Sequence, residues 1–418
     1  MKVLPAVKTD RWNFIANWVD GSLYAFALSL ASISTVIPLF IRELGGGGTA
    51  LVLVPALWYL GNNIPQVLVA GIVTAKQDVK AYVLVTAAVQ RIPWVIMALV
   101  TFLLIPVVPG IVAIIITLIG VLLLAIASSI NMPGWFELVS KITPRHYRGR
   151  LFAYRALTGA ILGVLGGLLV SYVLDFIPFP QNYGTLFLLA FLVTCLSYLA
   201  LCFLKEPTGG HAGQRATLLE SRNKMLSIIR ENKNFRNFLI ADALMILVLL
   251  ADGFFAVHAV EKFQLSAGYG GRFTIVMMLS MVLGNLFYGH IADNQGHRIN
   301  ITLGAFTAAS ASLTAILAPS IILYYLVFVF TAATAGLLHT SRLAFIAELA
   351  NEMDRALYVA LANLMTVPIA LLGIGGGWVT RHYGYEGLFA ITGLTALLIA
   401  AWMILKVKEP RLGISTLD

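Results

Sequence analysis

Gly289-His290-Ile291-Ala292-Asp293-Asn294-Gln295-Gly296-His297-Arg298 is the stretch that decides the fold of this chain. It is a short polar turn between two long apolar segments. The turn carries an acid, a base and two glycines, whereas a chain dissolved in lipid tolerates few charges inside the bilayer. It therefore predicts the end of one membrane-spanning helix and the start of the next.

The composition of the whole chain is that of an integral membrane protein. Of its 418 residues, 59% are hydrophobic and only 11% are charged, whereas about a quarter of the residues of a soluble protein are charged. Its apolar runs reach the roughly 20 residues that cross the hydrocarbon as a helix, while barrel strands would alternate over about 10 residues. We therefore predict an all-α integral membrane protein with twelve transmembrane helices. The spans are expected near residues 13–42, 50–75, 81–106, 109–140, 151–175, 184–204, 237–260, 271–292, 299–318, 320–349, 357–380 and 386–405.

The positions of Lys and Arg predict the orientation, because cytoplasmic loops carry an excess of them. Placing both termini in the cytoplasm leaves only Arg42, Lys262, Arg272 and Arg381 in outer loops. The formal net charge of +9 then reports topology and does not indicate a basic face for nucleic acid. We expect a protein of the cell (inner or plasma) membrane, in contact with the lipid bilayer and with no nucleic-acid partner.

Two segments of the first half recur in the second half. Leu162–Gly167 in the fifth span resembles Leu372–Gly377 in the eleventh, and Pro144–Gly149 resembles Asn351–Ala356 ahead of those spans. Duplicated halves are a common build of secondary transporters, with the binding site between them.

The repeat predicts two six-helix bundles, at residues 1–204 and 237–418, joined by a cytoplasmic linker at residues 205–236. Within the linker, apolar residues recur at helical spacing among charges from Leu218 to Ile229. This pattern predicts an amphipathic helix on the inner face of the membrane.

The turn at Gly289–Arg298 resembles the signature loop of the major facilitator superfamily, G-x-I/L-A-D-x-x-G-x-R/K. The resemblance implies twelve helices in two six-helix pseudo-repeats and a latch on the outward-open state formed by Gly289, Asp293, Gly296 and Arg298. We expect Gly289 to let two helices approach closely, Asp293 to meet a helix N-terminus and Arg298 to pair with an acid.

Other positions resemble the family less completely. The N-terminal copy of the loop, Gly71–Lys80, has Ala75 in place of the acid, so the C-terminal loop is expected to carry more of the latch. Arg148 and Gly149 resemble an Arg-Gly pair that the family often has ahead of the fifth span, and Arg355 is the repeat-related residue.

Glycines in the fifth span resemble those of proton-driven exporters, although the proline that completes the exporter motif is absent. They are Gly159, Gly163, Gly166 and Gly167. Small residues also let membrane helices pack closely without any further role.

Ionisable groups inside the spans are functional candidates because they are costly to bury. They are Asp20, Arg91, Arg155, Asp242, Asp252 and Arg342. Similar depths along the helices predict ion pairs of Asp20 with Arg91 or Arg155 and of Asp242 with Arg342, which would be structural fasteners if they are static. In the family, spans 1, 4, 7 and 10 line the cavity, which favours Asp20, Asp252 and Arg342 as substrate or proton residues.

Three further polar residues complete the candidates. His339 has the chemistry of a proton relay, Asn63 lies beside Pro65 in the second span, and Glu137 lies near the cytoplasmic end of the fourth. A packing role explains His339 equally well. Asn63 could instead satisfy backbone groups freed by the proline, and Glu137 could simply reach water.

The sequence offers no catalytic triad, no metal-ligand spacing and no nucleotide-binding loop, so we expect neither an enzyme nor a cofactor or metal. We expect a monomeric secondary transporter that moves a small molecule by alternating access, as a proton-coupled exporter of amphipathic compounds. An organic-anion carrier is the alternative, from the three intramembrane arginines. A non-transporting assembly factor or sensor is the second alternative.

Overall fold

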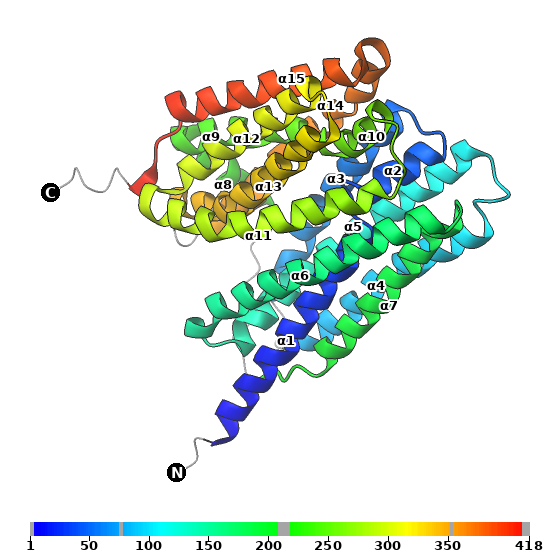
Figure 1. Cartoon of the computed structure of the whole chain (residues 1–418). Helices are drawn as coiled ribbons and strands as arrows, with labels where there is room; N and C mark the ends of the chain where they lie inside the picture. The colour runs from blue at the N-terminus through cyan, green and yellow to red at the C-terminus, as the bar shows by residue number, and fades with distance from the viewer. Residues whose placement is uncertain (1–3, 75–77, 208–217, 352–353, 412–418) are drawn as a thin grey trace. The chain divides into compact units, whose positions relative to one another are not determined.

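The computed structural model describes residues 4–74, 78–207, 218–351 and 354–411. Every regular element in these ranges is a helix (Figure 1). Nine helical segments of the described chain are long and apolar enough to cross a membrane, by length and composition. The predicted all-α membrane fold is confirmed.

The helices follow the predicted spans. They are α1 (Leu4–Leu30), α2 (Val36–Glu43), α3 (Gly48–Thr74), α4 (Val79–Leu103), α5 (Gly110–Ile142), α6 (Arg145–Phe176), α7 (Gln181–Cys202), α8 (Leu218–Glu231), α9 (Lys233–Leu249), α10 (Asp252–Lys262), α11 (Tyr269–Gln295), α12 (His297–Leu317), α13 (Ile321–Leu349), α14 (Arg355–Gly373) and α15 (Gly376–Lys406).

Three of the predicted spans are interrupted. The first is divided between α1 and α2, the seventh between α9 and α10 at Leu250–Ala251, and the eleventh between α14 and the start of α15. Inside α15, Gly384 has a φ of 68°, where the helix kinks between the eleventh and twelfth spans. Glycine adopts this left-handed conformation without the steric cost of a Cβ.

The chain forms two compact units. The N-terminal unit contains Met1–Gly46, Leu57–Arg215 and Ser266–Ile275, and the C-terminal unit contains Gly47–Ala56, Ala216–Leu265 and Val276–Asp418. The predicted division into bundles at residues 1–204 and 237–418, with a linker at residues 205–236, stays a prediction.

The predicted linker helix is present as α8, and the preceding residues 208–217 lie outside the described part of the chain. Lys224 of α8 forms an ion pair of 2.5 Å with Asp354, which precedes α14 in the C-terminal unit. Lys224 is half-exposed, so the pair contributes little to stability. The predicted position of α8 on the membrane surface stays a prediction.

A set of hydrogen bonds joins α1, the start of α4 and the residues after α7 at one end of the N-terminal unit. The side-chain amide of Asn13 donates to the carbonyl of Lys205 (2.9 Å), and the Lys205 N–H donates back to Asn13 Oδ1 (2.8 Å). The Glu206 carboxylate accepts from the N–H groups of Val79 (3.2 Å) and Lys80 (2.7 Å) in the first turn of α4. An acid there satisfies free donors and suits the positive end of the helix.

The C-terminal unit repeats this arrangement. Asn234 donates to the carbonyl of Lys408 (2.8 Å) and accepts from its N–H (2.7 Å), while Glu409 accepts from the N–H of Arg298 (2.8 Å) at the start of α12. We call each set an Asn–Lys–Glu clasp. Lys-Glu-Pro stands at 205–207 and at 408–410, so the internal repeat extends to individual hydrogen bonds.

The clasps predict matched effects on stability. Glu206→Ala and Glu409→Ala should each lower the free energy of unfolding by about 1 kcal/mol, the typical contribution of a lost N-terminal cap. Thermal unfolding of the purified protein in lipid nanodiscs measures the change, with the exposed Glu386→Ala as the control. Wild-type stability in both clasp variants would contradict the assigned capping role.

Candidate functional site

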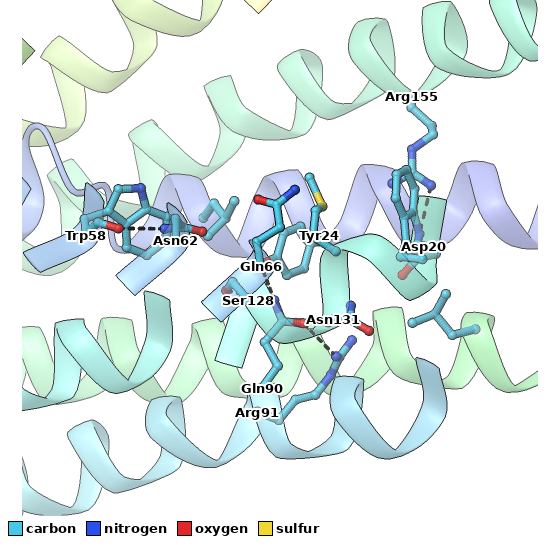
Figure 2. Close-up of a pocket in the computed structure, with 14 residues that line it drawn as sticks. Asp20, Tyr24, Trp58, Asn62, Gln66, Gln90, Arg91, Ser128, Asn131 and Arg155 are labelled. Atoms are coloured by element: carbon cyan, nitrogen blue, oxygen red, sulfur yellow. Dashed lines mark hydrogen bonds and ion pairs between the residues drawn. The ribbon is translucent and has the colours of Figure 1, made fainter. Parts of the chain in front are cut away.

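The N-terminal unit contains a cavity of about 300 Å³, in the range of small-molecule sites. Helices α1, α3, α4, α5, α6 and α7 line it (Figure 2). Its lining residues are Asp20, Tyr24, Leu28, Trp58, Asn62, Gln66, Gln90, Arg91, Ser128, Asn131, Met132, Trp135, Arg155 and Leu201.

Asp20 is the carboxylate of this cavity, and it is only 4% exposed. Its Oδ2 lies 3.4 Å from Nη1 of Arg155, and its Oδ1 accepts a hydrogen bond of 2.7 Å from Ser197. Arg155 also donates to the carbonyl of Asn17 (2.7 Å) and lies over the ring of Trp135. Of the two predicted partners, Arg155 is therefore the one that pairs directly.

Arg91 reaches Asp20 through a hydroxyl. Its Nη2 donates to Ser197 Oγ (3.3 Å), the same oxygen that donates to Asp20. Arg91 also donates to the carbonyls of Thr194 (3.0 Å) and Ala87 (2.6 Å) and to the side-chain oxygen of Gln90 (3.3 Å). One carboxylate is thus placed between two guanidinium groups, one in direct contact and one through Ser197.

Polar groups that the sequence did not single out line the rest of the cavity. Gln90 donates to the Tyr24 hydroxyl (2.7 Å) and to Ser128 (2.9 Å), while Asn131 accepts from Thr86 (2.9 Å). The sequence feature that could have indicated these residues is the presence of polar side chains within the apolar third and fourth spans. Helical depth alone did not show which way they face.

The second span contributes Asn62 and Gln66 to the cavity rather than Asn63. The Asn63 side chain donates to the carbonyl of Tyr59 (2.9 Å), one turn back on its own helix. Asn62 makes the equivalent bond to the carbonyl of Trp58 (2.9 Å). Bonds of this kind occupy the amide hydrogens, and rotation about the helix decides which amide faces the cavity.

The C-terminal unit contains the other predicted ion pair. Arg342 Nε lies 2.6 Å from Asp242 Oδ1, and Arg342 Nη2 lies 2.8 Å from Asp242 Oδ2. A third guanidinium nitrogen donates to Asn363 (3.1 Å). Two parallel bonds are the strongest geometry for such a pair, and the pair joins α9 to α13.

Asp252 lies elsewhere in the C-terminal unit, at the first residue of α10. It lines a small cavity of about 10 Å³ together with hydroxyl side chains of α12 and α13. No hydrogen bond or ion pair joins it to another residue in the described ranges. Asp252 is partly buried and does not share the large cavity with Asp20, so its role as a substrate or proton residue stays a prediction.

The remaining candidates line none of the cavities described above. His339 is exposed and Glu137 is half-buried, and neither has a hydrogen bond or ion pair within the described part of the chain. Nothing in their surroundings supports a proton relay through either residue.

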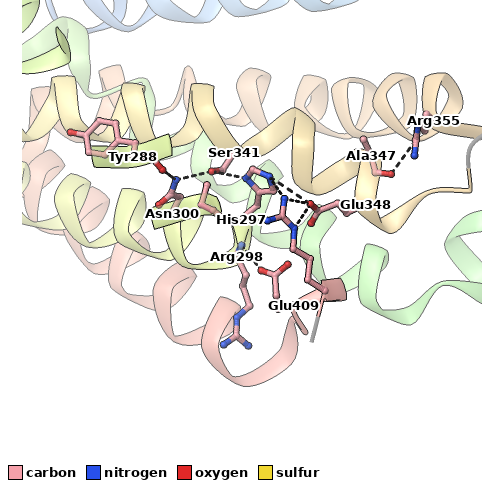
Figure 3. A network of polar contacts seen from close by, with 11 residues as sticks. Tyr288, His297, Arg298, Asn300, Ser341, Ala347, Glu348, Arg355 and Glu409 are labelled. Carbon is pink, nitrogen blue, oxygen red and sulfur yellow. Dashed lines mark hydrogen bonds and ion pairs between the residues drawn. The ribbon is translucent and has the colours of Figure 1, made fainter. Parts of the chain in front are cut away.

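The loop Gly289–Arg298 joins a polar network at the end of α11 (Figure 3). His297 lies 3.1 Å from Ser341 Oγ and 3.1 Å from a guanidinium nitrogen of Arg411. The same guanidinium lies 2.6 Å from Glu348. Gly296 has a φ of 85° and packs against the Glu409 side chain, so any other residue there would be strained and crowded.

Individual residues of this loop act differently from the sequence prediction. Asp293 is exposed and has no partner among the described residues, and Glu409 takes the helix N-terminus instead. The Arg298 side chain donates to the carbonyl of Val407 (3.0 Å) and not to an acid. Around Gly289, no atom of the described chain lies where a Cβ would meet it, so the expected close approach is absent. The latch itself stays a prediction.

Arg148 and Arg355 occupy equivalent places in the repeat. Arg148 donates to the carbonyls of Thr143 (3.1 Å) and Ser140 (2.5 Å), and Arg355 lies 3.4 Å from that of Ala347. A base near the last carbonyls of a helix stabilises its C-terminus. Both arginines therefore act as helix caps, Arg148 for α5 and Arg355 for α13. Gly149 is exposed, and a Cβ at this position would meet no neighbouring atom.

Comparison with known proteins identifies the fold. Residues 250–416 match the family model described as Major Facilitator Superfamily, and no curated protein sequence matches the chain. The structure is similar to that of a D-xylose-proton symporter, with a TM-score of 0.73 and 14% identity over 96% of this chain and 99% of that chain. It is also similar to the nucleoside transporter NupG, with a TM-score of 0.71 and 15% identity over 94% of this chain and 98% of that chain. A third similar structure is the human organic anion transporter MFSD10, with a TM-score of 0.63 and 15% identity over 94% of this chain and 99% of that chain. At these identities the likeness shows the fold and not the substrate.

The Asp242–Arg342 pair predicts strong coupling between the two residues. Asp242→Asn or Arg342→Gln alone should destabilise the protein by about 3 to 5 kcal/mol, because each removes one partner of a buried ion pair. The double variant should recover most of that loss. Thermal or denaturant unfolding of the four proteins measures the coupling, and additive effects of the two substitutions would rule out a fastening role.

Proposed function

Because the chain belongs to the major facilitator superfamily of small-molecule transporters, we propose that it is a proton-coupled secondary transporter of an amphipathic compound. The protein is an integral membrane protein that moves its substrate without a catalytic reaction. We place substrate binding in the 300 Å³ cavity of the N-terminal unit. We assign the coupling proton to Asp20 rather than to Asp252, because only Asp20 lines that cavity.

The observation that carries this proposal is the arrangement of Asp20 between Arg155 and Ser197 on the cavity wall. Asp20 belongs to α1, Arg155 to α6 and Ser197 to α7. Protonation removes the negative charge that holds these three helices together at one point. The proton therefore changes the packing of the helices that contact the substrate, which is the coupling that a secondary transporter needs.

The lining of the cavity favours a substrate that has an apolar or aromatic surface as well as hydrogen-bonding groups. Trp58, Trp135 and Tyr24 supply aromatic surface, while Asn62 and Gln66 supply amides. Ligand sites are typically mostly apolar, with a few polar groups that fix orientation. A molecule of amphipathic character satisfies both parts of this surface.

We propose export as the direction of transport, because the glycines of the predicted fifth span resemble those of proton-driven exporters. A Cβ at Gly159 would meet Ala25, and one at Gly166 would meet Ser29, so these glycines allow α1 and α6 to pack closely. Small residues at such contacts let helix backbones approach each other. Since Asp20 and Arg155 lie on the same two helices, close packing there also sets the geometry of the ion pair.

An organic anion is the second candidate substrate class. Two guanidinium groups, those of Arg91 and Arg155, line the cavity against the single carboxylate of Asp20. The positive excess would attract a carboxylate or sulfonate group. Protonation of Asp20 would increase that excess and strengthen anion binding.

Transport measurements test the role of Asp20. In proteoliposomes with an imposed pH gradient, wild-type protein should accumulate substrate, and Asp20→Asn should abolish the accumulation. The variant should retain exchange of substrate without a gradient, because the amide keeps the cavity but cannot ionise. Glu137→Gln is the matched control and should behave like wild type, since Glu137 does not line the cavity. Gradient-driven accumulation by Asp20→Asn would refute the assignment.

A ligand screen separates the substrate classes. Thermal unfolding is measured with tetraphenylphosphonium, benzoate, xylose and an uncharged amphipathic compound, and a ligand at 100 times its Kd adds about 2.7 kcal/mol of stability. Trp58→Leu should weaken binding of an amphipathic ligand about tenfold, or 1.4 kcal/mol. Trp378→Leu, whose ring is exposed and outside the cavity, should leave it unchanged.

Stabilisation by benzoate alone, strengthened at low pH, would favour the organic-anion carrier. Binding without flux under any gradient would favour a sensor or assembly factor over a transporter. Equal losses in Trp58→Leu and Trp378→Leu would mean that the ligand does not occupy the cavity.

A further inference from the structure

The seventh predicted span is broken near its middle. Helix α9 ends at Leu249, Leu250 and Ala251 form a turn, and α10 begins at Asp252, although Lys233–Lys262 as a whole is apolar enough to be a single span. Leu250 and Ala251 keep helical backbone angles, and their N–H groups donate to the carbonyls of Ile246 and Val248. A ligand at this turn would therefore be bound by side chains, and Asp252 is the acid that lies there.

A small polar cavity lies beside the break, with a volume of about 10 Å³. It is lined by Asp252 of α10, Ser312 of α12 and Thr331 and Thr334 of α13, with apolar residues completing its wall. A volume of this size holds roughly one water-sized particle. It is far too small for an organic substrate and suits a single ion.

The hydroxyl groups around the cavity have oxygens available for a ligand. Thr331 is 5% exposed, and its Oγ1 has no hydrogen-bond partner among the described residues. Ser312 Oγ lies 3.2 Å from the hydroxyl of Thr392. Each hydroxyl has one hydrogen to donate and two lone pairs, so both side chains can present an oxygen to a cation. A buried hydroxyl without a partner is costly, and a cation would remove that cost.

The charge of the site selects the class of ion. Asp252 is a single carboxylate with no ion-pair partner in the described ranges, and no group of three acid, His or Cys side chains there could hold a metal. One carboxylate neutralises one positive charge, whereas a divalent ion would leave a net buried charge, which is strongly unfavourable. The small cavity favours a small monovalent ion.

We propose that this cavity is a sodium site, in which the Asp252 carboxylate and the hydroxyl oxygens of Ser312 and Thr331 are ligands. The site joins α10 to α12 and α13 across the break in the seventh span. Sodium at this position supplies the charge that Asp252 lacks and holds the two parts of the span in register with their neighbours. The proposal does not depend on Asp20 or on the substrate cavity.

The experiment uses the full-length protein in lipid nanodiscs. Thermal unfolding is followed while NaCl replaces choline chloride at constant ionic strength and pH, with KCl as the second series. We expect saturable stabilisation by sodium that potassium does not reproduce, since only binding to the folded state shifts the transition in this way. Asp252→Asn should abolish the sodium effect. Thr331→Val, which removes one oxygen at almost constant volume, should lower the sodium affinity about tenfold.

Two controls keep the result specific. Thr366→Val removes another buried hydroxyl of the same unit, one that bonds to a main-chain carbonyl and lies outside the cavity, and should retain the wild-type sodium response. Asp20→Asn should also retain it, so loss of proton coupling and loss of the sodium site are distinguishable. If Asp252→Asn does not fold, Thr331→Val and Ser312→Ala decide the question.

Equal responses to sodium, potassium and choline in the wild type would overturn the proposal. So would a sodium response that Thr331→Val and Ser312→Ala leave unchanged. A response to pH alone, without any response to sodium, would also overturn it and would make Asp252 a proton carrier.

Discussion

Charge neutralisation inside a low-dielectric membrane is the constraint on which this structure depends. Asp20 is neutralised by Arg155 directly and linked to Arg91 through Ser197, and Asp242 is neutralised by Arg342. Each pairing requires a particular set of helices to meet at one depth, because an unpaired ion there costs several kcal/mol. The first set fixes α1 against α6 and α7, and the second fixes α9 against α13.

Depth along a helix could be predicted from the sequence, but rotation about the helix axis could not. Counting residues from the span ends was enough to pair Asp242 with Arg342, since both are level with each other. The same count could not decide whether Asn62 or Asn63 faces the cavity, because adjacent residues differ by about 100° in direction. It also could not decide whether Arg91 or Arg155 pairs with Asp20, and the structure shows direct contact for Arg155 and a link through Ser197 for Arg91.

Contacts between residues distant in sequence were the other part that could not be predicted. The signature motif predicted that Asp293, which lies in the loop itself, would meet a helix N-terminus. The N-terminus of α12 is instead capped by Glu409, which follows the twelfth span. The Lys-Glu-Pro repeat at 205–207 and 408–410 was visible in the sequence, but its meaning depends on the asparagines that meet it. The two halves keep the same clasp while their interiors differ: a large cavity in one unit, a bidentate ion pair in the other.

The position of the clasps has a consequence for biosynthesis. The N-terminal clasp needs no residue beyond Glu206, so a nascent chain can satisfy the exposed amides of α4 as soon as its sixth helix has left the ribosome. In the second half, the amides of α12 likewise wait until Glu409 has been synthesised, so each clasp forms only after the three spans that follow the capped helix. The first half can therefore close with its own clasp before the second half has been synthesised.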